Sequence, residues 1–134
     1  MIRRMRKKDL PCVKSLMQSI PGFWHETWSD ETLVRALSIS RELAFVYEID
    51  GQVAAFIFSY DLGFRAYLGE FGVIKTMRGR GIGRSLLQHV ESILRERGCE
   101  LVISDVWRSA EPFYRRLGWG SPEARLLRKR LTEN

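Results

Sequence analysis

The chain has 134 residues, of which 45% are hydrophobic and 28% charged, as expected for one globular domain with an apolar core. No apolar run approaches the roughly 20 residues of a membrane-spanning helix, and the basic N-terminus leads into no signal-peptide stretch. We therefore expect a cytoplasmic protein without a membrane partner. The net charge of +6 argues for an anionic partner without saying which one.

The cysteines and histidines predict neither a disulfide framework nor a metal site. Cys12 and Cys99 both lie among apolar residues, so we expect buried, inert thiols. His25 and His89 share no metal-ligand spacing with the cysteines or with each other. The sequence thus predicts a protein without a bound metal.

The N-terminal part of the chain predicts one short strand and two helices. Residues 2–5 form the strand, and Asp9 is expected to cap a helix whose apolar face runs from Leu10 to Ile20. The segment 21–24 ends that helix, and Ser29 is expected to cap the second one.

Three apolar runs follow and predict the middle of a β-sheet. The first two cover residues 43–49 and 53–60, and Asp50-Gly51 between them is a strong signal for a two-residue hairpin. The third run covers residues 66–74. Because the first two runs are apolar on both faces, we expect them in mid-sheet with helices covering them.

The second half of the chain alternates helices and strands. The clearest helix follows Gly83, carries one apolar stripe, and is expected to end at Gly98. A strand over 100–106, a helix over 110–117 and a last strand over 125–131 complete the prediction. The last strand is highly basic and is expected to protect a sheet edge.

The most informative segment, residues 78–84, joins the third apolar run to the long helix. Its unpaired amides and positive dipole end would bind phosphate, and its glycines would let the backbone approach a ligand closely. The alternative is a glycine-rich helix entry with solvated arginines. The spacing fits neither a Walker A loop nor the dinucleotide-binding fingerprint. In chain order, the segment consists of Arg78, Gly79, Arg80, Gly81, Ile82, Gly83 and Arg84.

With this loop the sequence resembles the GNAT N-acetyltransferase superfamily. Arg78, Gly81 and Gly83 match the family signature that follows the fourth strand. The stretch 110–119 resembles the family's Ala…Phe-Tyr…Leu-Gly-Phe segment, and the order of elements agrees from residue 2 to residue 131. The likeness therefore covers essentially the whole chain.

The resemblance implies a fold and an activity. The fold is α/β (α+β), with a mixed, mostly antiparallel central sheet flanked by about four helices, in one domain over residues 1–134. The activity is transfer of the acetyl group of acetyl-CoA to a primary amine by direct attack on the thioester. A catalytically weak acyl-CoA-binding module of the same fold is the alternative. A nucleic-acid-binding protein is disfavoured, because no aromatic residues interleave with the basic ones.

The resemblance also implies which residues hold the cosubstrate. The strand at Phe71 and Val73 would pair its backbone with the pantetheine arm, and the loop 78–84 would hold the pyrophosphate. Tyr114 corresponds to the tyrosine beside the coenzyme A sulfur, where it would donate a hydrogen bond. The chain departs from the family at Trp107, where asparagine is common.

The reaction needs a neutral amine and therefore a group that takes the proton of the ammonium form. A lysine-like amine with a pKa of ~10.4 requires a dedicated base, whereas an α-amine near ~8 nearly does without one. Glu70, on the fourth predicted strand, is the candidate base, and Asp105 is the reserve. The alternative for Glu70 is a surface carboxylate paired with Arg65.

An aromatic acceptor site is implied between the first two helices. The link holds Phe23, Trp24 and Trp28, with His25 and Glu26 among them, and the corresponding link in the GNAT superfamily lines the acceptor site. The alternative is that these rings clamp the link to the core. The implied partner is an amine on a small molecule or a protein. The sequence does not identify this amine, and it leaves open whether the protein forms a homodimer.

Overall fold

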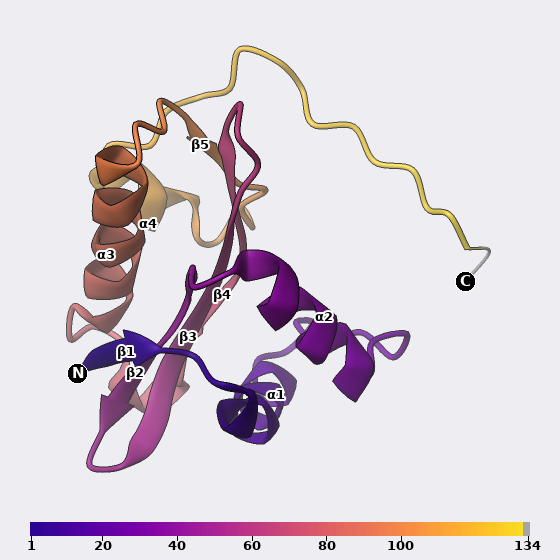
Figure 1. Cartoon of the computed structure of the whole chain (residues 1–134), viewed down its shortest axis with the longest axis vertical. Helices are drawn as coiled ribbons and strands as arrows, with labels where there is room; N and C mark the ends of the chain where they lie inside the picture. The colour runs from indigo at the N-terminus through magenta and orange to yellow at the C-terminus, as the bar shows by residue number, and fades with distance from the viewer. Residues whose placement is uncertain (133–134) are drawn as a thin grey trace. The chain divides into compact units, whose positions relative to one another are not determined.

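The computed structural model describes residues 1–132 and divides them into two compact units, residues 1–104 and 105–132 (Figure 1). The second unit contains the helix α4 (Glu111–Arg116). None of the described helices is long and apolar enough to cross a membrane. In chain order, the first unit contains β1 (Ile2–Arg4), η1 (Lys7–Asp9), α1 (Leu10–Ser19), α2 (Asp30–Ser40), β2 (Ala44–Ile49), β3 (Gln52–Asp61), β4 (Ala66–Val73), η2 (Lys75–Met77), α3 (Ile82–Glu96) and β5 (Val102–Ile103).

The strands form one five-stranded sheet in the order β1-β2-β3-β4-β5. All neighbours are antiparallel except β4 and β5, which are parallel. The predicted hairpin is confirmed: Asp50 and Gly51 have φ values of 51° and 76°, the left-handed conformations that a tight two-residue turn between twisted strands requires. With α1 to α4 described, the predicted mixed sheet and its helices are confirmed.

Helices cover both faces of the central strands, as the apolar runs predicted. Phe56 and Phe58 of β3 are fully buried in a cluster with residues of α1 and α2. On the other face, the Phe45 ring of β2 meets the His89 ring of α3 edge to face at 4.6 Å. Figure 1 shows α3 on one side of the sheet and α1 and α2 on the other. His89 is therefore a packing residue.

The predicted cap of α2 is confirmed, whereas that of α1 is confirmed in position only, since Asp9 is the N-cap residue but its side chain makes no capping hydrogen bond. The Ser29 amide donates to the Thr32 hydroxyl (2.9 Å) while the Thr32 amide donates to the Ser29 hydroxyl (3.4 Å), which is a capping box. Asp9 directly precedes α1, but its carboxylate accepts from the Arg6 amide (2.7 Å). The physical reason is the turn η1, which places Asp9 in helical conformation already and directs its side chain backwards.

Asp9 instead anchors an ion pair that ties β1 to the start of α1. The Arg3 guanidinium donates to both Asp9 oxygens at 2.8 Å and to Glu48 of β2 at 3.2 Å. The hydrogen bonds from Arg3 and the Arg6 amide lower the pKa of Asp9, although burial opposes them. The pair therefore stabilises the fold above the unfolded pKa near ~4, and this contribution is lost as pH falls through the lower folded value.

Replacing Arg3 with methionine is expected to lower the free energy of unfolding by about 2–3 kcal/mol at neutral pH, because the carboxylate of Asp9 then stays buried without its main partner. Urea denaturation at pH 7 and near pH 3 measures this, and the deficit should shrink at the lower pH. Arg4→Met is the control, since the Arg4–Glu42 pair is more than half exposed on both sides. Equal losses for the two variants would contradict the assignment.

Two predicted strands are wrong in extent or existence. The strand over 100–106 shrinks to β5, and within residues 1–132 the segment 125–131 forms no strand. Leu127 and Leu131 in that segment are 88% and 90% exposed. A strand needs a neighbour to pair its backbone, and the described segment has none that would hold it extended in a sheet.

The prediction of two buried thiols is wrong for Cys12 and holds only in part for Cys99. Cys12 is exposed and Cys99 is half-buried, and both are free. Helix periodicity explains the first case: Val13, Leu16 and Met17 of α1 face the core, and Cys12 precedes that face by one residue.

Candidate functional site

A β-bulge in β4 determines where Glu70 lies. The register between β3 and β4 shifts so that Gly69 and Glu70 together oppose Phe58 of β3. A bulge of this kind places both of its residues on one face of the sheet. A Cβ atom at Gly69 would lie 2.9 Å from a ring carbon of Tyr60, so any other residue at that position would have to displace the Tyr60 ring. The bulge thus turns Glu70 to the face that α1 and α2 cover.

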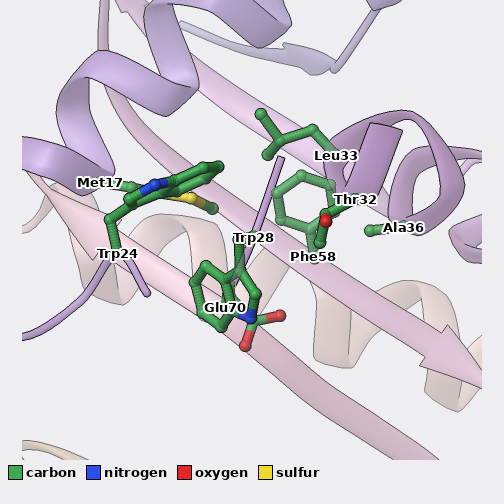
Figure 2. Close-up of a pocket in the computed structure, with 8 residues that line it drawn as sticks. All are labelled: Met17, Trp24, Trp28, Thr32, Leu33, Ala36, Phe58 and Glu70. Carbon is green, nitrogen blue, oxygen red and sulfur yellow. The ribbon is translucent and has the colours of Figure 1, made fainter. Parts of the chain in front are cut away.

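On that face Glu70 lines a small pocket of about 40 Å³, drawn in Figure 2. The walls come from α1, α2, the link between them, β3 and β4. Figure 2 labels the lining residues Met17, Trp24, Trp28, Thr32, Leu33, Ala36, Phe58 and Glu70. The predicted base and two of the three predicted aromatic residues therefore share one pocket.

The aromatic residues of the link divide into two groups. Trp24 and Trp28 meet edge to face at 5.5 Å and line the pocket. Phe23 packs edge to face on Phe56 at 5.6 Å, so it clamps the link to the core, as the alternative reading held. His25 is exposed and lies against the Trp28 ring at 4.6 Å.

Two residues near the pocket were missed from the sequence. The Lys14 ammonium lies 5.4 Å from the centroid of the Trp24 ring and 2.8 Å from the Asp30 carboxylate, so it holds the link from the α1 side. Tyr60 of β3 is largely buried, and burial together with the charge of Glu70 raises its pKa. Its ring stacks on Tyr67 at 6.4 Å. Tyr60 pairs with Tyr67, and only the shifted register of β4 brings it near Glu70, so no local signal in the sequence pointed to it.

The glycine-rich loop leads directly from β4 into α3. Gly79 and Gly81 have φ values of 81° and 80°, the left-handed region that glycine adopts without strain. The helix begins at Ile82, earlier than predicted, with Gly81 as its N-cap and no capping side chain. Its first hydrogen bond runs from the Ser85 amide to the Gly81 carbonyl (3.0 Å). The amides of residues 82–84 therefore have no partner inside the helix.

The surroundings of this loop are positive and open to solvent. Arg78, Arg80 and Arg84 are all exposed. Arg78 donates from Nε to the Val73 carbonyl at 3.0 Å, which holds the loop against the end of β4 and does not use its terminal guanidinium nitrogens. Free amides, a helix N-terminus and guanidinium groups together form a set of donors suited to phosphate oxygens.

The pairing between β4 and β5 ends before the residues of β4 that were predicted to pair with the cosubstrate. Its paired residues are Ala66 with Val102 and Tyr67 with Ile103, and Ser104 then donates from its hydroxyl to the Leu68 carbonyl (2.9 Å). Phe71 and Val73 lie beyond this point, still paired with β3. Their position fits the expected parting of the two strands.

Tyr114 belongs to the second unit, where α4 holds it. Its side chain is 9% exposed and contacts the rings of Phe113 and Trp119 edge to face, each at 5.3 Å. Burial, with a smaller effect of the Asp105 carboxylate, raises the pKa of Tyr114 to about 12. The hydroxyl therefore keeps its proton and acts as a hydrogen-bond donor. Trp107 is half exposed, and its carbonyl accepts from the Ala110 amide (2.9 Å).

The family model described as the acetyltransferase (GNAT) family matches residues 13–119. The chain belongs to the GNAT acetyltransferase family. The match begins within α1 and ends after α4, so it extends over parts of both units. Membership agrees with the sequence resemblance and with the order of strands in the sheet.

Solved GNAT-like structures show the same fold. Ard1 from Thermoplasma volcanium superposes with a TM-score of 0.79 at 24% identity, over 88% of this chain and 80% of that one. The ribosomal-protein-S18-alanine N-acetyltransferase from Escherichia coli superposes with a TM-score of 0.74 at 27% sequence identity, over 88% of this chain and 76% of that one. The PaiA N-acetyltransferase from Thermoplasma acidophilum, in complex with coenzyme A, superposes with a TM-score of 0.76 at 19% sequence identity, over 93% of this chain and 92% of that one.

Within residues 1–132 no group of three or more His, Cys, Asp or Glu side chains is arranged to hold a metal ion. The first unit of this GNAT protein brings Glu70, the end of β4 and the glycine-rich loop into one continuous segment, residues 70–84. The pocket residues on α2 were missed as site residues, because their spacing on the helix is that of ordinary core positions.

Proposed function

We propose that this protein is an N-acetyltransferase that moves the acetyl group of acetyl-CoA to a primary amine by direct attack on the thioester. The observation that carries the proposal is the turn into α3, where a left-handed Gly81 starts the helix without a capping side chain. Membership of the acetyltransferase family supports acyl transfer, and the PaiA relative contains coenzyme A. The S18-alanine relative is named for an amine acceptor on a protein.

The residues present fit coenzyme A as a ligand. In the proposal the amides of residues 79–84 and the guanidinium groups of Arg78, Arg80 and Arg84 hold its diphosphate. The β4 backbone at Phe71 and Val73 lies along its pantetheine arm. When bound, acetyl-CoA supplies an activated acyl group as a thioester. The chain's own residues must then orient an amine, take its proton and exclude water.

Glu70 is proposed as the base. Its carboxylate lies in the pocket between Trp24, Trp28 and Phe58, where an incoming ammonium group would meet one negative charge in apolar surroundings. A carboxylate there both attracts the ammonium form and accepts its proton, directly or through a water. The buried Tyr60 hydroxyl nearby keeps its proton, because burial and Glu70 raise its pKa, so it offers a donor on the same face.

Tyr114 is proposed as the second catalytic residue, and the two units are proposed to work as one domain. Tyr114→Phe is expected to lower turnover about 100-fold or more while acetyl-CoA affinity stays within twofold, because only a donated hydrogen bond is removed. Steady-state kinetics and calorimetric titration separate the two effects. Tyr47→Phe, on β2, is the matched control. With a pKa of about 12, Tyr114 should cause no loss of activity up to about pH 10.

The activity itself is tested by thiol release. Purified protein is incubated with acetyl-CoA and a set of amines, and the free thiol of coenzyme A is measured with a chromogenic disulfide. We expect release that depends on the amine. Binding of acetyl-CoA without release for every amine would favour the alternative, a catalytically weak acyl-CoA-binding module. Absence of both binding and release would contradict the proposal.

A further inference from the structure

A basic turn between β1 and α1 lies outside the candidate site. Its residues Arg6, Lys7 and Lys8 are consecutive, and all three side chains are exposed. None of the three forms an ion pair with another of residues 1–132. The basic turn therefore presents three positive charges to solvent within one short stretch of backbone.

The charged residues around the basic turn are already paired with one another. Asp9, the carboxylate that follows it directly, is buried, and Arg3 donates to both of its oxygens at 2.8 Å. On α1, the Lys14 ammonium binds the Asp30 carboxylate at 2.8 Å. The positive charge of the basic turn is therefore not neutralised by these neighbouring carboxylates.

Buried residues on both sides fix the backbone of the basic turn. Met5 before it and Leu10 shortly after it both belong to the hydrophobic core. The Asp9 amide donates to the Arg6 carbonyl at 2.9 Å, and the Arg6 amide donates to the Asp9 carboxylate at 2.7 Å. A backbone that is ordered beforehand reduces the entropy lost when a partner binds. The three cations thus form a preorganised surface.

The helix α1 leads from the basic turn to the pocket that contains Glu70. Along this helix, Lys14 lies over the Trp24 ring and Met17 lines the pocket (Figure 2). From Lys8 to Met17 the chain advances roughly 14 Å, at about 1.5 Å per helical residue. An extended polypeptide covers that distance in roughly four residues, at about 3.3 Å each. A polypeptide with its amine at the pocket therefore has the length to reach the basic turn.

We propose that the basic turn is a docking surface for an acidic acceptor polypeptide, whose carboxylates lie about four residues away from the reacting amine. This inference rests on the proposed function and adds a partner surface to it. Each carboxylate meets an ammonium or guanidinium group at the solvent-exposed surface, so the attraction weakens with salt. Such a surface speeds association and lowers KM without touching the reacting atoms.

A nucleic acid fits the basic turn less well than a polypeptide does. Proteins bind single strands by stacking bases on aromatic side chains beside positive charges, and residues 1–10 include no aromatic residue. Three cations are also few for a duplex, which commonly receives about six to ten phosphate contacts. An acidic polypeptide is therefore the partner that both the charge and the distance favour.

The acceptor class is tested with three hexapeptides that begin with Ala-Gly-Gly and end with three glutamates, three glutamines or three lysines. We expect kcat/KM for the glutamate peptide to exceed that of the glutamine peptide about tenfold or more at low salt, with the lysine peptide lowest. The difference should lie in KM, with kcat unchanged, and should shrink at about 0.5 M salt. Equal kcat/KM for the three peptides would overturn the inference.

Charge variants locate the surface that attracts the peptide. Lys7→Glu is expected to lower the preference for the glutamate peptide about threefold or more, whereas Lys7→Arg should keep it. Arg6→Gln is a second variant of the same turn and should act in the same direction as Lys7→Glu. The matched control is Arg95→Glu, at an exposed position of α3 on the other side of the sheet from α1 (Figure 1). Equal losses in Lys7→Glu and Arg95→Glu would overturn the basic turn as the docking surface.

Binding without reaction gives an independent readout. The N-terminally acetylated glutamate peptide has no amine to react and can be titrated into the protein by NMR. We expect the backbone amide signals of residues 6–8 to shift and those of residues 95–97 to stay. Larger shifts of residues 6–8 at lower concentration with an oligonucleotide of the same charge would overturn the choice of a polypeptide.

The outcomes separate this inference from the proposed function. Thiol release at equal rates from the glutamate and glutamine peptides, with unchanged signals of residues 6–8, overturns the docking surface while acetyl transfer to amines stands. Absence of thiol release with every amine overturns the proposed function and the acceptor role together. Shifts of residues 6–8 in that case would still identify the basic turn as a binding surface for acidic polypeptides.

Discussion

Gly83→Asp is expected to weaken acetyl-CoA binding about 100-fold or more while leaving the protein at least as stable as before. Gly83 lies in the first turn of α3, where a carboxylate interacts favourably with the helix dipole and so stabilises the free protein. The same carboxylate would meet the diphosphate at contact distance. Two unit charges at 4 Å repel by about 1–4 kcal/mol between water and an effective dielectric constant of 20, which is about fivefold to nearly a thousandfold in affinity.

Isothermal calorimetry with acetyl-CoA and thermal unfolding without it measure the two effects separately. Ser92→Asp is the matched control, because it adds the same charge at an exposed position later on the same helix. Its affinity for acetyl-CoA should stay within about threefold of the original, given screening by salt. If Gly83→Asp binds acetyl-CoA as well as the control does, the phosphate site is not at the start of α3.

Glu70→Gln is expected to lower kcat/KM for an α-amine by about 10²- to 10⁴-fold near neutral pH, the range that a general base contributes. The amide keeps the shape of the side chain in the pocket and removes both its charge and its ability to take a proton. Because an α-amine loses its proton in solution with a pKa near ~8, the deficit should narrow as pH rises above that value. Acetyl-CoA affinity should not change.

A pH series of kcat/KM with alaninamide tests the role of Glu70. Glu26→Gln is the matched control, because Glu26 is an exposed carboxylate on the link beside the pocket residue Trp28. A deficit that stays constant from pH 7 to pH 10 would indicate that Glu70 positions the amine without taking its proton. An unchanged rate would remove Glu70 from the mechanism.

Local signals in the sequence predicted most of the fold. The Asp50-Gly51 turn lies between two apolar runs, and its left-handed conformation follows from those two residues. The helix α3 has an apolar stripe, a glycine entry and Gly98 in left-handed conformation just after its end. In each case short-range chemistry and burial favour the same structure, so the pattern is decisive.

The predictions that failed concern features that depend on partners far away in the chain. The bulge at Gly69 and Glu70 is a register shift between two strands, and nothing in the alternation of β4 distinguishes it from a regular strand. Asp9 lies at the N-cap of α1, but its carboxylate binds Arg3 of β1 and makes no capping hydrogen bond. The basic segment 125–131 was predicted as a strand, but a strand exists only where a neighbour pairs with its backbone.

The same difference between local and long-range determinants separates the parts of the candidate site. The loop 78–84 could be predicted because its function depends on consecutive backbone amides. The Glu70 pocket could be predicted only in part: Trp24 and Trp28 stand out as aromatic residues in a link, whereas Leu33 and Ala36 look like ordinary residues on the inner face of a helix. Only the packing of α2 against β3 and β4 gives them a common role.

The diphosphate site is tested most directly by a crystal structure of the protein with coenzyme A bound. We predict that the diphosphate oxygens lie within hydrogen-bonding distance of backbone amides between Gly79 and Arg84, with Arg78 or Arg80 at the rim. A diphosphate bound elsewhere on the protein, with those amides facing solvent at saturating coenzyme A, would contradict the phosphate site on which the proposed function depends.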